Sequence, residues 1–557
     1  MGGINPKEFI QELAFCLRQE DLVKAKALLQ FSSDTNVSQD VQKQALDELA
    51  RGPERIVFPL LEYLTKVEIS DLEVQEGLYD LIMDKAYGNT DLVIEYISNN
   101  EKPTRLQFLR AAGDLYLTET LPALTRIITQ ESDPDILTAA IQAVGRFRKQ
   151  ESLPALGGLA THSDIQIKKA AIFAVSENGG PEAIKALTSF IGEDEQTNKL
   201  AVEALADIQS QDALHALTKL LSSPITNIRD TAIDQLTKLG SKATPLLTNA
   251  FKNAESDYLI HLITTLGYIR DPAAVSAILD IVNTQPKDAN IRQAAYEAME
   301  RLPSPKTAIC LVQGLQDPVE SVRMSAARAI DKNLSKPLVA GLKNIVREGS
   351  QAARMTVAAL IDTQATNIFN FLVQEEQFQE LAKTHITNSA SPAIRKTFAK
   401  QMAALGKKEF AEAVTDGAKD SGKQADPSTK IIVVDDSKMM LRLYQNKLSS
   451  MNYTSEAYSR PEEAIPEILK KKPDLVITDL NMPNISGLEL TREVRKKFTR
   501  KDLPILMITT QSDFVEQKTG DMDVNDAILK KSGINQVLHK PFTDEALNAA
   551  VTALLPR

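Results

Sequence analysis

A repeat with a period of 31 to 32 residues runs through most of this 557-residue chain. Small or aliphatic residues mark it, each at the centre of a helical pattern, with spacings of 31 and later 32 residues: Ala139, Ala170, Ala201, Ala232, Ile263, Ala294, Ala326 and Ala358. A second helical pattern follows, and helix breakers such as Asp133-Pro134 separate the units. A fixed period with two helices per unit predicts an all-α solenoid, whose stacked helices need small residues where they approach closely.

Several units open their first helix with an apolar residue followed by a basic one: Ile167-Lys168, Ile228-Arg229, Ile291-Arg292, Val322-Arg323 and Ala353-Arg354. With these pairs, the units resemble HEAT-like repeats of the short variety found in bilin-lyase-like proteins. The resemblance implies a solenoid over residues 1–412 with degenerate N-terminal units. The basic residues either bond neighbouring repeats as a ladder or line a binding groove. The ladder is favoured because units carry the basic residue regardless of their position.

The last part of the chain has a different pattern, in which short apolar runs predict buried parallel strands at residues 430–434, 474–478, 504–508 and 536–539. Each run is followed by polar side chains, namely Asp435 and Asp436, Asp479, Thr509, and Lys540. The carboxyl ends of parallel strands form the edge where ligands bind, so these groups are expected to converge. Neighbouring carboxylates repel one another unless a cation joins them, and oxygen-only ligands suit Mg²⁺. The set supports phosphoryl transfer onto a carboxylate.

In this strand context, the five side chains resemble the site of receiver domains of bacterial two-component response regulators, which have the chemotaxis-regulator fold. The resemblance covers residues 429–557 and implies a flavodoxin-like α/β domain with a five-stranded parallel sheet in the order 2-1-3-4-5. It implies that Asp479 is the phosphoacceptor and that Thr509 and Lys540 contact the phosphoryl group. It also implies Mg²⁺ as the cofactor, held by Asp435, Asp436, Asp479 and the backbone carbonyl of Asn481.

Charge and composition indicate which partners the chain is expected to bind and where in the cell it is expected to be. Residues 429–557 hold 19 Lys and Arg against 18 Asp and Glu, which leaves 45 against 56 for the rest of the chain. An acidic solenoid is a poor binder of nucleic acid, so no nucleic-acid partner is expected. The sequence has no run of 18 or more apolar residues, so no insertion into a membrane is expected. Cys16 and Cys310 lie in helical patterns and are expected to be core residues with free thiols. Free thiols are typical of a reducing compartment, so a cytoplasmic location is expected.

Residues 413–428 are expected to form a flexible linker, because they are rich in Gly, Ser, Asp and Lys and nearly free of apolar side chains. No histidine is followed by an acidic residue, as a sensor-kinase phosphohistidine would be, and no glycine-rich nucleotide loop is present. The chain is therefore expected to receive phosphate without making it. Beyond its own phosphorylation and dephosphorylation, no enzymatic activity is expected.

The favoured function is a phosphorylation-controlled signalling adaptor. Its expected partners are a cognate histidine kinase or phosphotransfer protein, and a protein target of the solenoid. Two alternatives stay open. The receiver is a phosphate sink or shuttle that the solenoid only locates, or the solenoid is a HEAT-type enzyme such as a lyase.

One position departs from the receiver pattern. Val537 stands three residues before Lys540, where receivers carry an aromatic residue that turns inward on activation. The sequence between Thr509 and Lys540 is also longer than is usual in that family. We therefore expect phosphorylation to be read out through residues 511–531, with little role for Val537.

Overall fold

The computed structural model describes residues 6–32, 38–99, 101–223, 225–390, 392–416, 429–451, 453–480, 482, 485–510, 532–540 and 542–555. The chain divides into two compact units, Met1–Ala216 and Leu217–Arg557. Among the helices in these ranges, none combines the length and the apolar character that crossing a lipid bilayer requires.

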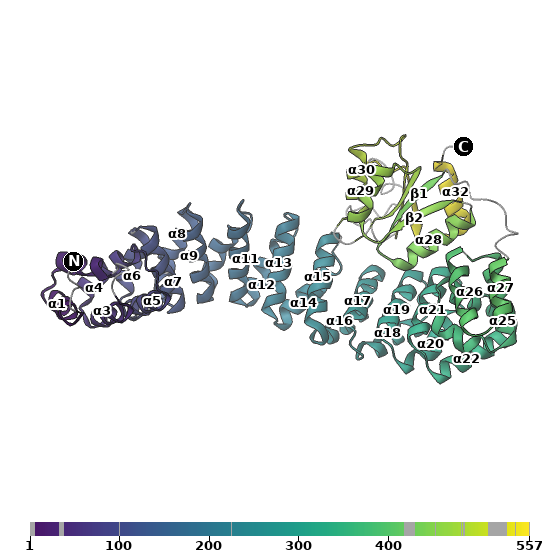
Figure 1. Ribbon diagram of the computed structural model, residues 1–557, viewed down its shortest axis with the longest axis horizontal. Helices are drawn as coiled ribbons and strands as arrows, with labels where there is room; N and C mark the ends of the chain where they lie inside the picture. The colour runs from purple at the N-terminus through teal and green to yellow at the C-terminus, as the bar shows by residue number, and fades with distance from the viewer. Residues whose placement is uncertain are drawn as a thin grey trace. The chain divides into compact units, whose positions relative to one another are not determined.

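The first unit is built from pairs of helices (Figure 1). Its helices are α1 (Pro6–Gln19), α2 (Leu22–Ser32), α3 (Gln39–Arg51), α4 (Glu54–Thr65), α5 (Leu72–Ala86), α6 (Thr90–Asn99), α7 (Lys102–Asp114), α8 (Leu121–Gln130), α9 (Pro134–Phe147), α10 (Leu153–Gly157), α11 (Ile165–Asn178), α12 (Pro181–Ser189) and α13 (Glu195–Ile208). The boundary between the two units falls within α14 (Gln211–Leu220). The first helix of each pair packs against the first helix of the next, with α7, α9, α11 and α13 side by side. This stacking is the predicted all-α solenoid.

The second unit continues the same pattern of paired helices before the chain enters a sheet. Its repeat helices are α15 (Thr226–Leu239), α16 (Thr244–Ala250), α17 (Ser256–Ile269), α18 (Ala274–Asn283), α19 (Ala289–Arg301), α20 (Ala308–Gly314), α21 (Glu320–Lys332), α22 (Lys336–Arg347), α23 (Gln351–Asp362), α24 (Thr366–Leu372), α25 (Glu376–Asn388), α26 (Pro392–Ala404) and α27 (Lys408–Asp416). The predicted end of the solenoid at residue 412 falls inside α27. Residues 417–428 of the predicted linker lie outside the described residues.

Small residues allow the stacked helices to approach closely. A Cβ atom on Gly145 in α9 would lie 3.1 Å from the Cα of Ala174 in α11. On Gly267 in α17 it would lie 3.0 Å from the Cα of Ala298 in α19. The marker residues of the repeat are buried at Ala201, Ala232, Ile263, Ala294 and Ala326 but only half-buried at Ala139, Ala170 and Ala358, where a neighbour such as Ala140 or Ala171 is the buried residue instead.

The basic residues that open the first helices form the predicted ladder between repeats in part, at Lys168 and Arg292. The Nζ of Lys168 in α11 donates to Asp194 Oδ2 at 3.1 Å and to Thr197 Oγ1 at 3.0 Å, both in the next repeat. Arg292 in α19 donates through Nε and Nη2 to the Asp317 carboxylate, at 2.6 and 3.0 Å. Two other members donate to carbonyls of the loop before their own helix: Arg229 to Ser223, and Arg323 to Asp317 and Pro318.

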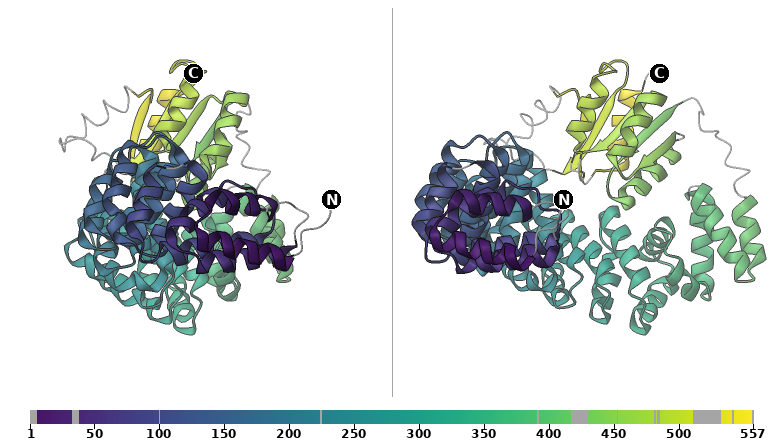
Figure 2. Two further views of the ribbon diagram at one scale, coloured as in Figure 1. Left: turned by 90° about the vertical axis from the view of Figure 1, so that its left-hand side faces the viewer. Right: turned by 60° about the vertical axis from the view of Figure 1, so that its left-hand side comes forward.

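The chain ends in an α/β domain (residues 429–555), where parallel strands form one sheet with helices on both faces (Figure 2). The strands are β1 (Lys430–Val434), β2 (Thr454–Tyr458), β3 (Leu475–Asp479), β4 (Ile505–Thr510) and β5 (Gln536–Lys540), and their order is β2-β1-β3-β4-β5. All neighbouring pairs are parallel. The described helices are α28 (Lys438–Ser450), α29 (Pro461–Lys471), α30 (Gly487–Arg495) and α32 (Asp544–Leu554). The predicted receiver topology is confirmed.

Alternation along the strands explains how both faces of the sheet become buried. Ile431, Val433 and Ile477 point into one cluster, which α28 and α32 cover. Ile432 and Val434 point to the opposite face, which α29 and α30 cover. Successive strand residues face opposite sides, so a continuous apolar run supplies both cores. Polar side chains are thereby left for the ends of the strands.

Candidate functional site

The carboxyl edge of the sheet carries the predicted site residues. Asp435 follows β1 directly, and Asp479 is the last residue of β3, its neighbour in the sheet. Thr509 lies near the end of β4, and Lys540 is the last residue of β5. The parallel register thus brings together four residues that are up to 105 positions apart along the chain.

Lys540 binds both buried carboxylates at this edge. Its Nζ donates to Asp479 Oδ1 at 2.6 Å and to Asp435 Oδ2 at 3.0 Å. Only 1% of Asp435 and 8% of Asp479 is exposed. Burial disfavours the ammonium, but the charges of Asp435 and Asp479 outweigh it and raise the pKa of Lys540 well above its ordinary value. The lysine is therefore a fixed positive charge that neutralises part of the acidic site.

Asp436 is the third carboxylate of the site, and part of its side chain is exposed. Its pKa is raised to about 7, first because its carboxylate is partly withdrawn from water and then because of the charge of Asp435, while Lys540 acts in the opposite direction. Glu297 of α19 and Asp230 of α15 raise this pKa further. The local excess of negative charge favours a bound proton or a bound cation at this position.

The donor chemistry of the site fits Mg²⁺. Asp435, Asp436 and Asp479 offer only carboxylate oxygens, the ligand type that this ion prefers. Within the described ranges, however, no three carboxylate, imidazole or thiol groups converge on one point. The Lys540 ammonium bridges two of the carboxylates instead. Asn481 lies outside the described residues, so the ligand role of its carbonyl stays a prediction.

The structure describes two of the three remaining predicted features, Thr509 and Val537, but not the segment 511–531. Thr509 is fully buried on the neighbouring strand β4, where it follows Ile508, the register partner of Asp479. Val537 packs against Leu480 and Met507 in a small cluster of its own. Residues 511–531, the predicted readout segment, lie outside the described residues.

Gly487 packs against the backbone of Asp479, a contact that was not predicted from the sequence. It is the first residue of α30, and its N–H donates to the carbonyl of Leu480 at 2.8 Å. A Cβ atom at this position would lie 2.1 Å from the carbonyl oxygen of Asp479. Only glycine therefore fits here. A recognisable signal was the capping box of Ser486 and Glu489, which fixes the start of α30 next to the loop after β3.

We expect Gly487→Ala to impair the site, because the added methyl group forces the backbone of Asp479 to move. Phosphoryl labelling by a small phosphodonor should slow by roughly tenfold or more, since about 1 Å of misplacement costs orders of magnitude in rate. Unfolding in urea should show a loss of about 1–3 kcal/mol from overpacking. The matched control is Gly341→Ala in α22, where the nearest atom would be 3.6 Å away. Equal labelling rates for both variants would contradict the prediction.

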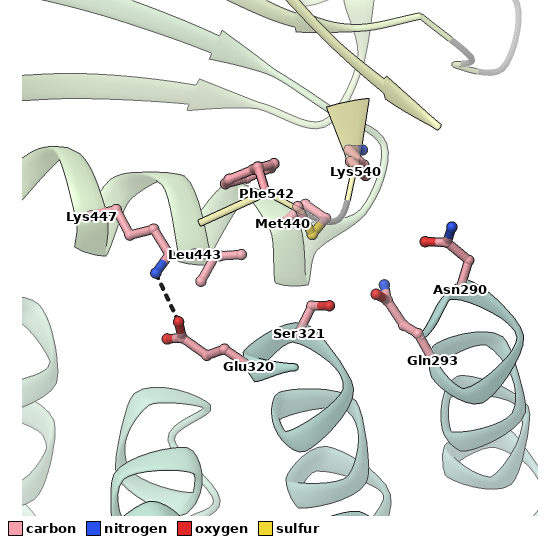
Figure 3. Close-up of a pocket in the computed structure, with 9 residues that line it drawn as sticks. All are labelled: Asn290, Gln293, Glu320, Ser321, Met440, Leu443, Lys447, Lys540 and Phe542. Atoms are coloured by element: carbon pink, nitrogen blue, oxygen red, sulfur yellow. Dashed lines mark hydrogen bonds and ion pairs between the residues drawn. The ribbon is translucent and has the colours of Figure 1, made fainter. Parts of the chain in front are cut away.

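Within the second unit, the α/β domain contacts the repeat helices next to this site. A small pocket of about 40 Å³ has repeat residues on one wall and site residues on the other (Figure 3). Asn290, Gln293 and Glu320 come from α19 and α21. Lys540 and Phe542 come from the end of β5 and the loop that follows it.

Helix α28 makes the polar contacts of this interface. The Nζ of Lys447 donates to Glu320 Oε2 at 2.8 Å, and Arg442 Nη1 donates to the carbonyl of Thr363 at 3.4 Å. Met324 of α21 is buried in the same cluster as the apolar face of α28. The helix that covers one face of the sheet is thus also the helix that binds the repeats.

Comparison with protein families agrees with this division of the chain. The model of the response regulator receiver domain matches residues 431–552. The model of HEAT repeats matches residues 121–198, 184–261 and 244–331. The two matches coincide with the α/β domain and with the central part of the helical array.

Individual relatives resemble the α/β domain. A chemotaxis protein CheY homolog of Campylobacter jejuni is 34% identical over 128 residues, which are 23% of this chain and 92% of that protein. The chemotaxis protein CheY1 of Helicobacter pylori is 35% identical over 128 residues and is covered to 96%. Among solved structures, the chemotaxis protein CheY4 of Vibrio cholerae is 29% identical, with a TM-score of 0.20, and the match covers 23% of this chain and 98% of that one.

Proposed function

Because the chain belongs to the response-regulator family, with HEAT repeats ahead of a receiver domain, we propose that it is a phosphorylation-controlled signalling adaptor. In this proposal, a histidine kinase or phosphotransfer protein delivers a phosphoryl group to Asp479. The state of that residue then sets how the HEAT repeats bind a target protein. The chain acts as an enzyme only on itself.

One observation carries the proposal over a phosphate sink. Lys540 contacts the acceptor Asp479 and also lines the pocket whose far wall is α19 and α21. A change in charge at Asp479 therefore acts, through Lys540, on the pocket beside α19 and α21. A sink would need no such contact, because its only task is to accept and release phosphate.

The residues of the site divide the work of phosphoryl transfer. A carboxylate oxygen of Asp479 attacks phosphorus, the bond from phosphorus to the donor breaks, and the leaving group keeps that electron pair. Lys540, already 2.6 Å from Asp479 Oδ1, binds a phosphoryl oxygen through its ammonium. Thr509 on the adjacent strand supplies a hydroxyl to another. Mg²⁺, when bound by Asp435, Asp436 and Asp479, supplies the positive charge that offsets the transferring group.

A new dianion at Asp479 changes the balance at the repeat interface. Glu297 and Asp230 already act on Asp436 as like charges. An acyl phosphate of roughly −1.5 to −2 charges in place of the −1 carboxylate of Asp479 makes the same side more negative by about 0.5 to 1 charge. The recruitment of Lys540 by the phosphoryl group, together with the negative charge that a bound Mg²⁺ would leave unbalanced, weakens the contact with α19 and α21. The repeat face is then free for a target protein.

Affinity capture from the native cytosol tests the adaptor function. The immobilised full-length chain is compared with and without beryllium fluoride and Mg²⁺, a stable mimic of the phosphoryl group. We expect at least one protein to be retained several-fold more strongly in one state, and Asp479→Asn to retain it equally with and without the mimic. Charge reversal by Glu320→Lys should move retention toward the activated level, because it opens the contact with Lys447. Retention that ignores the mimic favours the sink.

A further inference from the structure

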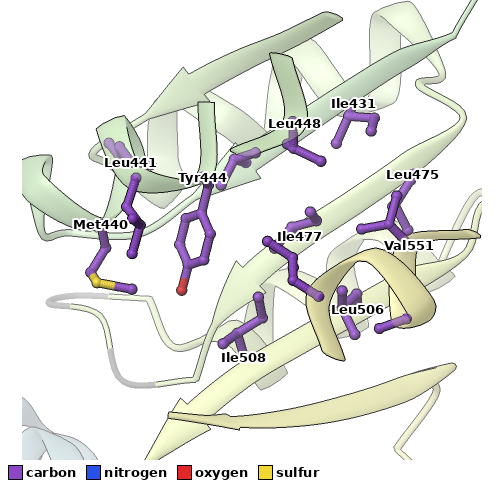
Figure 4. Close-up of a cluster of buried hydrophobic side chains, with 14 of the residues drawn as sticks. Ile431, Met440, Leu441, Tyr444, Leu448, Leu475, Ile477, Leu506, Ile508 and Val551 are labelled. Atoms are coloured by element: carbon purple, nitrogen blue, oxygen red, sulfur yellow. The ribbon is translucent and has the colours of Figure 1, made fainter. Parts of the chain in front are cut away.

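Tyr444 has a buried hydroxyl that the fold itself does not explain. The residue lies in the middle of α28 and is 1% exposed, within the cluster that covers the sheet. Figure 4 shows its ring hanging from α28 among Met440, Leu441 and Ile508, with the hydroxyl at the end away from the helix. Within the described part of the chain, this hydroxyl has no hydrogen-bond partner. A buried hydroxyl without a partner is costly, so a phenylalanine would be the better choice for packing alone.

The Lys540 ammonium is the charged group that acts most directly on this hydroxyl. Burial raises the pKa of Tyr444 well above its ordinary value, and Lys540 acts against this rise through its charge and as a hydrogen-bond partner of the ionised form. Tyr444 also stacks on Phe542, with ring centroids 5.9 Å apart and an angle of 15° between the planes. Phe542 follows Lys540 by two residues, so the tyrosine ring fixes the same segment that carries the lysine.

Counting the hydrogen bonds of Lys540 indicates what the hydroxyl is for. An ammonium has three N–H groups, and two of them are directed to Asp435 and Asp479. A hydroxyl accepts as well as donates, so the oxygen of Tyr444 is suited to the third. If Asp479 were phosphorylated and Asp435 held Mg²⁺, Lys540 would lose both of its present acceptors, and its ammonium would bond to a phosphoryl oxygen instead. A neutral acceptor beside it then holds the ammonium in place.

We propose that Tyr444 is the positioning residue of Lys540, and that its hydroxyl accepts an N–H of the ammonium when Asp479 is phosphorylated. This inference rests on the proposed function of Asp479 as phosphoacceptor. It places the readout of the phosphoryl group on α28 and Phe542, which also face the repeat helices. The contact between Lys540, Tyr444 and Phe542 then links the phosphorylation site to that interface.

The test compares Tyr444→Phe with the wild-type full-length chain, because phenylalanine keeps the stacking and removes only the hydroxyl. Calorimetric titration measures the affinity for beryllium fluoride in the presence of Mg²⁺. We expect an affinity about tenfold lower, the size of one hydrogen bond to a charged group. Without the mimic, the variant should be at least as stable as the wild type, because the unpartnered hydroxyl is gone. The KM for a small phosphodonor should change little, while kcat falls.

A double-mutant cycle separates positioning from packing. In a Lys540→Met background, Tyr444→Phe should have no further effect on the affinity for beryllium fluoride. Tyr453→Phe is the matched control, since Tyr453 packs at the margin of the same cluster. Equal affinities of Tyr444→Phe and wild type, or additive effects of Tyr444→Phe and Lys540→Met, overturn the inference and leave the proposed function intact. Failure of the wild type to bind the mimic would overturn both.

Discussion

Asp479→Asn is expected to abolish phosphoryl labelling of the full-length chain by a small phosphodonor and Mg²⁺. The amide is a poor nucleophile, and it cannot replace the carboxylate that binds Lys540 at 2.6 Å. Intact-mass analysis should show one added phosphoryl group on the wild type and none on the variant. Chelation of Mg²⁺ should suppress labelling of the wild type to the same extent, because the metal offsets the charge of the transferred group.

Asp474→Asn is the control that keeps the number of charges equal. This residue precedes β3 at the opposite edge of the sheet, where its carboxylate accepts the N–H of Lys430 at 2.7 Å. It should be labelled like the wild type. Labelling that persists in Asp479→Asn, or that does not depend on Mg²⁺, would disprove the assignment of the phosphoacceptor.

Lys540→Met is expected to destabilise the α/β domain by about 3–5 kcal/mol in the absence of Mg²⁺, the usual cost of removing one partner from a buried ion pair. Asp435 and Asp479 would remain as two buried like charges. Millimolar Mg²⁺ should recover much of this loss, because an ion that binds only the folded state stabilises it by mass action. Urea unfolding with and without Mg²⁺ measures both effects.

The pH dependence of this variant follows from the same charges. In the wild type, the pKa of Lys540 is raised, so its contribution to stability is fully present below its unfolded pKa of about 10.4 and constant between pH 5 and 8. Without the lysine, one carboxylate has its pKa raised above the unfolded value of about 3.9. Folding then takes up a proton, so the stability deficit of Lys540→Met should shrink as the pH falls from 8 to 5.

Lys471→Met is the matched control, since Lys471 forms exposed ion pairs with Glu456 and Glu467 in the same domain. It should show neither the loss of stability nor the rescue by Mg²⁺, because exposed pairs are screened by water. A Lys540→Met variant that unfolds like the wild type with and without Mg²⁺ would show that Lys540 does not neutralise this site.

Local pattern was sufficient to predict the two folds and the strand ends that carry four of the predicted site residues. The period of the repeat fixed where helices begin, and the apolar runs placed Asp435, Asp479, Thr509 and Lys540 at strand ends. These predictions succeeded because helix and strand periods are properties of neighbouring residues, and because parallel strands end at one edge. The ladder at Lys168 was predicted for the same reason, since each unit repeats the environment of the last.

Long-range contacts were beyond the reach of the sequence. The sequence of α28 does not predict that Tyr444 interacts with Lys540. It also does not predict that Lys447 pairs with Glu320, which lies more than a hundred residues earlier. Gly487 read as a helix breaker, and only packing showed that a Cβ there would meet the Asp479 carbonyl. Such contacts depend on how separate elements dock, which side-chain volume and charge decide in three dimensions. The sequence by itself determined the two folds and which polar side chains follow the strands, and the tertiary structure decided which residues pack around those side chains, because docking depends on contacts between elements far apart in the chain.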